Sequence, residues 1–137
     1  MAMRRHSWLF SALLVLTLSG INCKHQPPTP VKQSTEPVWI KVGTWSGRGD
    51  AQLETFPVDY FTWRVRWEAK NESRAGSGTL QVTANSADSG RTIAEVVDKQ
   101  GVGTDVTYIT ELPRRYYLAV TSTGVDWTLT AEALIPR

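Results

Sequence analysis

Apolar and polar side chains alternate along residues 60–70, YFTWRVRWEAK, and again along residues 125–134, VDWTLTAEAL. Successive side chains of a β-strand point to opposite faces, so each stretch predicts a strand with one buried face and one solvated face. The aromatic residues on the two apolar faces are Phe61, Trp63, Trp67 and Trp127. We expect these side chains to fill the core, since each buries on the order of 200 Å².

Six more stretches of strand-like composition lie between turns rich in Gly, Asn, Ser or Pro. They are residues 38–45, 52–56, 78–84, 91–98, 105–111 and 115–122. Eight short strands with a turn about every ten residues are typical of two packed antiparallel sheets. The pattern therefore predicts an all-β fold over residues 38–137, a two-sheet antiparallel β-sandwich of the jelly-roll type.

Residues 1–22 have the layout of a secretory signal peptide. Arg4 and Arg5 precede an apolar run at residues 8–18, and small and polar residues follow this run. As a helix the run would span about 16 Å, against about 30 Å for the hydrocarbon core of a bilayer. It is too short for a permanent membrane span, so we expect residues 1–22 to direct export and to be removed.

Cys23, the single cysteine of the chain, directly follows this segment. The stretch LSGINC resembles the lipobox of bacterial lipoproteins, in which the cysteine becomes the acylated first residue. Acylation would also protect a lone exported thiol from stray oxidation. The alternative is cleavage by ordinary signal peptidase, which leaves a soluble secreted protein, because Asn22 stands where a small residue is usual.

Residues 23–37 are rich in Pro, Lys and Thr and lack hydrophobic periodicity, so we expect an extended tether there. Without the signal peptide the number of basic residues falls from 15 to 13, which equals the 13 acidic residues. The exported chain therefore has no excess of positive charge with which to bind nucleic acid. The expected location is the bacterial envelope, either on a membrane through the lipid anchor or free in the periplasm or medium.

Between Trp45 and Glu132 the chain resembles small exported bacterial β-sandwich modules of the pre-peptidase C-terminal and CUB-like kind. The stretches that carry the resemblance are WSGRG, TFPV, WRVRW, GTLQV, VVDKQGVGTDVTY and RRYYLAVTSTGVDWTLTAE. The last is the most specific, because a Tyr-Tyr-Leu strand, a Gly turn and an alternating Trp-Thr-Leu-Thr strand close such sandwiches. The resemblance implies a non-catalytic accessory module like those on secreted enzymes and surface proteins.

Groups suited to catalysis are few once the signal peptide is removed. The single remaining histidine, His25, lies in the tether and is poorly placed to activate a Ser or Cys nucleophile. The carboxylates left as candidates are Glu54, Asp59, Glu68, Asp88, Glu95, Asp105 and Asp126. Glycoside hydrolysis needs a carboxylate pair, so a carboxylate-dependent hydrolase is one alternative function. No pair is indicated by the spacing, and we therefore expect no enzyme.

The segment DKQGVGTD, residues 98–105, is the candidate ion site. Asp98 and Asp105, with carbonyl groups around Gly101 and Gly103, offer oxygen ligands of the kind that calcium prefers. Two carboxylates are fewer than a tight calcium site supplies, and Asp and Gly are also ordinary turn residues. We therefore expect a turn here, with calcium as the alternative and no other cofactor.

Arg48, Gly49 and Asp50 form the tripeptide by which many extracellular proteins bind integrins. An RGD-type cell adhesin is therefore a second alternative function. Gly49 permits a positive φ, which suits a tight loop after the first strand. We expect only this loop role, with the two charges keeping the loop solvated.

Trp39 and Trp45 are the tryptophans outside the signal peptide that are not assigned to the core, and they are the candidates for a surface site for sugar rings. We expect Arg64 and Arg66 to lie on a solvated face. Together these patterns predict an exported, lipid-anchored, non-catalytic binding or structural module of the bacterial envelope. Its expected partners are the membrane and an unknown protein or glycan.

Overall fold

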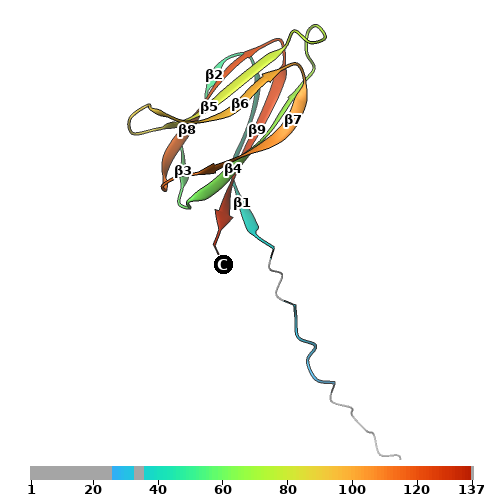
Figure 1. The fold of residues 1–137 in the computed structure, drawn as a ribbon, viewed down its shortest axis with the longest axis vertical. Helices are drawn as coiled ribbons and strands as arrows, with labels where there is room; N and C mark the ends of the chain where they lie inside the picture. Colours follow the sequence, from blue (N-terminus) through green and yellow to red (C-terminus); the bar gives the residue numbers. More distant parts are fainter. Residues whose placement is uncertain (1–25, 33–35, 137) are drawn as a thin grey trace, which may run out of the picture. The chain divides into compact units, whose positions relative to one another are not determined.

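The computed structural model describes residues 26–32 and 36–136. The chain divides into two units, Met1–Ser34 and Thr35–Arg137. In the first unit, residues 26–32 are exposed and have no regular secondary structure. The second unit contains nine strands (Figure 1). Over the described residues there is no helix that is long and apolar enough to cross a membrane.

Turns and short loops connect the nine strands. Their bounds are β1 Val38–Arg48, β2 Ala51–Gln52, β3 Phe56–Val58, β4 Thr62–Lys70, β5 Thr79–Ser86, β6 Thr92–Gln100, β7 Gly103–Thr110, β8 Arg114–Thr123 and β9 Asp126–Ile135. Burial alternates residue by residue along β4 and β9, as the sequence pattern predicts.

The strands form two antiparallel sheets. Sheet A has the order β1-β9-β4-β7, and sheet B has the order β2-β8-β5-β6, with β3 also paired to β8. The first strand, β1, and the last, β9, are neighbours in sheet A. When β2 and β3 are counted as one interrupted edge strand, each sheet has four strands, and their order is that of an eight-stranded jelly roll. The predicted all-β sandwich of the jelly-roll type is therefore confirmed.

The strand predicted at residues 52–56 is in fact two short strands, β2 and β3. Both pair with β8, and the segment between them keeps one hydrogen bond to that strand, from Leu53 N to Leu118 O at 2.9 Å. Pro57 in β3 has no N–H to donate, which an edge strand tolerates. Sequence composition indicates a strand here but does not show its interruption.

The core lies between the two sheets and is rich in aromatic rings. Trp63, Trp67 and Trp127 are 0%, 9% and 3% exposed, as the alternation predicts. The Trp63 ring packs against Tyr116 of sheet B, with centroids 4.8 Å apart, and against Phe56 at 5.8 Å. Aromatic contacts of this kind stabilise a core beyond their buried area, so these rings tie the two sheets together.

Phe61 is the exception to the predicted core, because 61% of its surface is exposed. Strand β4 begins at Thr62, so Phe61 lies just before the strand. The Phe61 carbonyl accepts a hydrogen bond from Glu111 N at 2.9 Å, which fixes the backbone while the ring stays outside. The prediction for Phe61 was wrong because alternation does not show where a strand begins.

Candidate functional site

Arg48 ends β1 and lies opposite Asp126 of β9. Its Nη1 donates to Asp126 Oδ1 at 2.8 Å and to the Asn71 carbonyl at 3.2 Å, and its Nη2 donates to Ser73 Oγ at 2.5 Å. Asn71 Nδ2 donates to the second oxygen of Asp126 at 2.9 Å. The hydrogen bonds from Asn71 and Arg48 lower the pKa of the Asp126 carboxyl. Arg48 thus joins β1, β9 and the loop after β4.

Gly49 and Asp50 are also bonded within the domain. Gly49 has a φ of +83°, which confirms the predicted turn, and its carbonyl accepts a hydrogen bond from Trp127 Nε1 at 2.9 Å. Asp50 Oδ1 accepts a hydrogen bond from Ser122 N at 2.8 Å. The prediction that the charges of the tripeptide only solvate the loop was wrong, because both charged side chains connect separate elements.

Trp127 also explains the glycine that precedes the tripeptide. Gly47 pairs with Trp127 across β1 and β9, and a Cβ at position 47 would lie 2.8 Å from Trp127 Cζ2. This is closer than two carbon atoms approach without a shift of the indole. Gly47 therefore leaves room for the buried ring, while Gly49 accepts its N–H. An integrin would have to displace internal bonds of Arg48 and Asp50 to bind these side chains.

Asp98 and Asp105 are strand residues and do not share a loop. Asp98 is in β6 of sheet B and Asp105 is in β7 of sheet A, and the turn between these strands is residues 101–102. Asp98 Oδ1 accepts from Gln81 Nε2 at 3.4 Å, and Asp105 Oδ1 accepts from Val106 N at 2.8 Å. Among residues 26–32 and 36–136, no group of three or more His, Cys, Asp or Glu side chains is placed to hold a metal ion. The calcium site stays a prediction without a cluster to support it.

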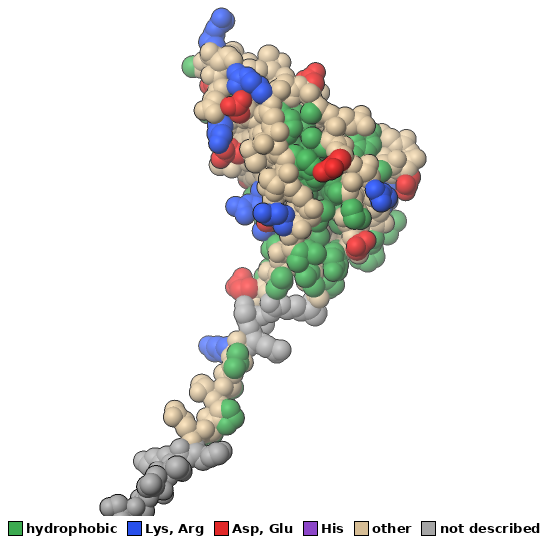
Figure 2. All heavy atoms as spheres, turned by 180° about the vertical axis from the view of Figure 1, so that it is seen from behind, with side chains coloured by type: hydrophobic (Ala, Val, Ile, Leu, Met, Phe, Trp, Pro, Cys, Tyr) green, Lys and Arg blue, Asp and Glu red, His purple; other side chains and the backbone are tan. Residues whose placement is uncertain are grey.

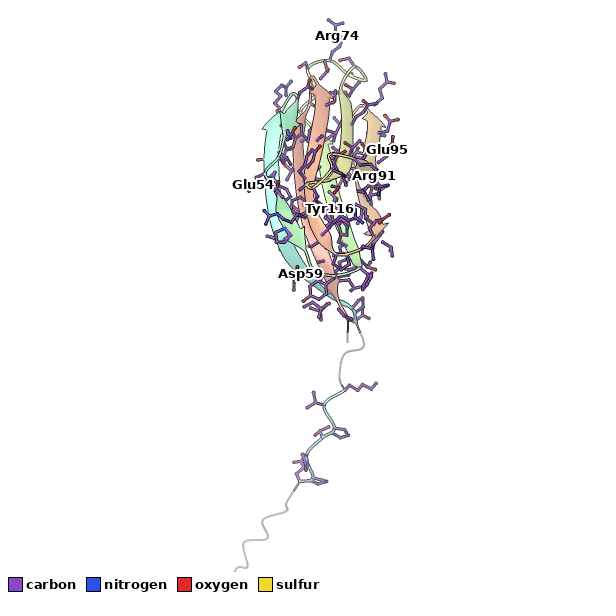
Figure 3. The ribbon with its side chains drawn as sticks, turned by 90° about the vertical axis from the view of Figure 1, so that its left-hand side faces the viewer. Glu54, Asp59, Arg74, Arg91, Glu95 and Tyr116 are labelled. Atoms are coloured by element: carbon purple, nitrogen blue, oxygen red, sulfur yellow. The ribbon has the colours of Figure 1, made fainter. Side chains whose placement is uncertain are left out.

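The carboxylates considered for hydrolysis are spread over the domain. Figure 3 shows Glu54, Asp59 and Glu95 at three separate places. Glu68 lies 3.1 Å from the ammonium group of Lys70, on its own strand. Glu54, Asp59 and Glu95 therefore do not form the facing pair that glycoside hydrolysis requires.

The outer face of sheet A carries a cluster of charged and aromatic side chains. Arg64 of β4 lies between Glu132 of β9 and Tyr108 of β7 in the register. Arg64 Nε donates to Glu132 Oε2 at 2.5 Å, and the guanidinium carbon is 4.1 Å from the centroid of the Trp39 ring. Trp39 meets Tyr108 edge to face, with centroids 5.8 Å apart. Arg64 faces outward as the alternation predicts, but its side chain is only 19% exposed because Trp39 and Glu132 cover it, so the expectation of a solvated side chain was wrong.

A depression of about 320 Å³ lies beside this cluster, and we call it the sheet A groove. The charged and hydroxyl side chains that line it are Lys41, Arg66, Glu68, Thr104, Thr128, Thr130 and Glu132. Arg66 lies 3.9 Å from Glu132, and its side chain is 60% exposed, as predicted. Period-two alternation indicates that these residues face outward, but only the strand register brings them together.

The two tryptophans considered for sugar binding have other partners. Trp39 lies against Arg64, as described above. Trp45 packs against Phe56 with centroids 5.1 Å apart, and its Nε1 donates to Glu54 Oε1 at 3.3 Å. A sugar ring would have to displace Arg64 to stack on the covered face of Trp39.

Cys23, the candidate acylation site, lies outside the described residues. No protein-family model matches the chain, and no curated protein sequence matches it.

Proposed function

We propose that this chain is an exported, lipid-anchored, non-catalytic binding module of the bacterial envelope. The export signal and the lipobox-like LSGINC support export and anchoring at Cys23. The Pro-rich segment that follows supports a tethered domain rather than an embedded one. The ordinary signal peptidase product, a soluble secreted module, is the alternative for localisation.

The observation that carries the binding role is the sheet A groove. All four strands of sheet A contribute to its lining, with basic, acidic and hydroxyl side chains next to one another. Side chains carried by paired strands are held more precisely than side chains on loops. A surface of mixed charge and hydroxyl groups suits a partner that is itself rich in such groups, which describes both envelope proteins and envelope glycans.

Membership of the pre-peptidase C-terminal or CUB-like families is part of the same proposal. Two antiparallel sheets in jelly-roll order support it at the level of architecture. The most specific stretch of the resemblance, RRYYLAVTSTGVDWTLTAE, lies in β8, the turn after it and β9. An accessory role beside a secreted enzyme or a surface protein would follow from that membership.

The test is crosslinking in living cells from two matched positions. A photoreactive amino acid replaces Arg66 in the sheet A groove or Gln81, which is exposed on sheet B. We expect adducts to an envelope protein or glycan from position 66 and none from position 81. Equal yields from both positions, or no adduct from either, would count against a binding role for the groove.

A further inference from the structure

Exposed apolar side chains gather at the end of the domain where β1 begins and β9 ends (Figure 2). We call this surface the apolar end. It consists of the exposed Val38, Ile40, Phe61, Leu112 and Pro136 and of Leu134, which is partly buried. Phe61 is 61% exposed and Leu112 is 59% exposed, which is unusual for large apolar side chains in an otherwise well-packed domain. Exposed apolar clusters of this kind mark contact surfaces for proteins or membranes.

Phe61, Leu112, Leu134 and Pro136 lie next to one another within the apolar end. Phe61, Leu134 and Pro136 line one hollow of about 240 Å³, together with Asp59, Tyr60 and Thr62. Leu112 is held near Phe61 by the residue before it, because Glu111 N donates a hydrogen bond to the Phe61 carbonyl at 2.9 Å. The backbone that carries Leu112 is also held from below, because Tyr116 Oη donates to the Leu112 carbonyl at 3.0 Å. The apolar end is therefore a fixed surface and not a loose loop.

The opposite end of the domain is polar. It carries the ion pair of Arg48 and Asp126 and the turn that holds Arg74, which Figure 3 places at the far end from Asp59. Within the described residues, Val102 in the turn between β6 and β7 is the large apolar side chain exposed there, at 49%. The domain therefore has one apolar end and one charged end.

Two aromatic side chains border the apolar end. Trp39 pairs with Leu134 across β1 and β9, and its ring contacts that of Tyr108, which is 60% exposed. Trp and Tyr are enriched at the boundary between the headgroups and the acyl chains of a bilayer, where one part of the ring is dry and the other is wet. Trp39 and Tyr108 lie next to exposed Leu and Phe side chains, as aromatic residues do where a protein surface passes from the acyl chains to the headgroups.

The chain itself limits how far this end can be from an anchor. Cys23 and Val38 are 15 positions apart, so an acyl group on Cys23 would hold the start of β1 within about 50 Å of the bilayer. A tether of this length makes the contact between the domain and the membrane intramolecular. A contact that is too weak to hold a free domain on a membrane can then be well populated.

We propose that the apolar end of the domain docks on the lipid bilayer to which the chain is tethered, with Phe61 and Leu112 entering the headgroup region. The inference rests on the lipid anchor of the proposed function. Docking places the charged end, with Arg48 and Asp126, away from the membrane. The sheet A groove would then stand on the side of the domain, open to partners in the aqueous phase.

Charge at the apolar end favours no particular headgroup. Arg114 pairs with Glu111 at 3.9 Å, and Arg64 pairs with Glu132 at 2.5 Å, so these two basic groups are matched by acidic groups. Two further charged residues near this end, Arg115 and Asp59, are opposite in sign. Juxtamembrane clusters of unmatched Lys and Arg are what give a protein a preference for anionic lipid. Docking should therefore take place on zwitterionic lipid and gain little from anionic lipid.

The experiment replaces the acyl anchor with an artificial one. All the described strands and the core lie in Thr35–Arg137, so a chain that starts at position 23 keeps the folded unit. Its Cys23→Ser form carries an N-terminal histidine tag and is attached to phosphatidylcholine vesicles that contain nickel-chelating lipid. A polarity-sensitive fluorophore is placed through Leu112→Cys at the apolar end, or through Val102→Cys at the charged end as the matched control.

We expect attachment to raise the emission of the fluorophore at position 112 several-fold and to shift it to the blue, with no change at position 102. Adding Phe61→Ser to the Leu112→Cys chain should remove most of the rise, while the melting temperature stays close to that of the parent because Phe61 is exposed. No rise at position 112, or an equal rise at both positions, overturns the proposal. A rise that needs only higher protein concentration and no vesicles also overturns it, and assigns the surface to a second copy of this chain.

The outcome is independent of acylation in the cell, because the tag supplies the anchor. Failure of the vesicle experiment overturns docking and leaves the lipid anchor intact. Failure of fatty-acid labelling at Cys23 overturns the anchor, and the vesicle result then shows whether the apolar end still binds lipid.

Discussion

Asp50 Oδ1 accepts a hydrogen bond from the backbone nitrogen of Ser122 at 2.8 Å. The two residues are 72 positions apart, and the bond ties the loop that leaves sheet A to β8 of sheet B. A carboxylate that accepts a backbone N–H makes a charge-assisted bond, which is stronger than a neutral one. The acidic residue of the adhesion-like tripeptide thus serves to connect the two sheets.

Asp50→Ala should lower the free energy of unfolding by about 1 to 2 kcal/mol, because it leaves the Ser122 N–H without its acceptor. Denaturant titration of the purified domain measures this change. Asp88→Ala is the matched control, since Asp88 is exposed in the turn between β5 and β6. If the two variants are equally stable, the bond to Ser122 contributes nothing measurable.

Asp126 predicts a specific dependence of stability on pH. The hydrogen bonds from Asn71 and Arg48 lower the pKa of its carboxyl in the folded state. The ionised carboxylate therefore stabilises the fold at pH values above the pKa that this carboxyl has in the unfolded chain, about 4. This stabilisation is lost as the pH falls through the lower pKa of the folded state. Wild type should melt at a higher temperature than Asp126→Asn at neutral pH, and the difference should shrink as the pH falls below about 4. A gap that is constant across thermal melts at several pH values would contradict this linkage.

Trp63 and Phe61 should respond differently to truncation, although the sequence places them in the same phase. Trp63→Ala should cost about 3 to 5 kcal/mol, as large-to-small changes at buried aromatics do. Phe61→Ala should change the stability by only about 0.5 kcal/mol, because the ring is largely exposed. Urea unfolding of both variants gives the comparison. A large loss in Phe61→Ala would mean that this ring is buried in solution.

Cys23 should carry lipid. Growth with labelled fatty acid should mark the wild-type protein and leave the Cys23→Ser variant unmarked, because the thiol is the only one in the chain. Detection of the labelled band after electrophoresis is the measurement. Both equal labelling of the two forms and absence of label from both would contradict the prediction, and absence of label supports the soluble secreted alternative.

The strands and the buried tryptophans could be predicted from the alternation of apolar and polar side chains, because every strand of such a sheet buries one face and exposes the other. Thus Trp63, Trp67 and Trp127 are buried where the pattern places them. The same rule does not mark where a strand starts, so Phe61 was assigned to the core. It also does not mark the interruption between β2 and β3, since this depends on how the edge meets β8.

Contacts between strands lie beyond such patterns. Arg48 and Asp126 are 78 positions apart, and only the register of β1 with β9 makes them neighbours. The same holds for Trp39, Arg64 and Tyr108 on the outer face of sheet A. A glycine such as Gly49 signals a turn through its own backbone, and its positive φ could therefore be predicted from the sequence.

The last described strand, β9, lies in sheet A between β1 and β4. Among the described residues, β1 therefore has no partner in its own sheet until the 10 residues of β9, Asp126–Ile135, are present. When the chain leaves a ribosome or a secretion pore N-terminus first, sheet A cannot be completed until β9 has emerged. Loop closure across the whole domain then precedes completion of the fold, which makes folding slow and late rather than progressive. A chain that stops before β9 would leave β1 and β4 with open edges that can pair with other chains.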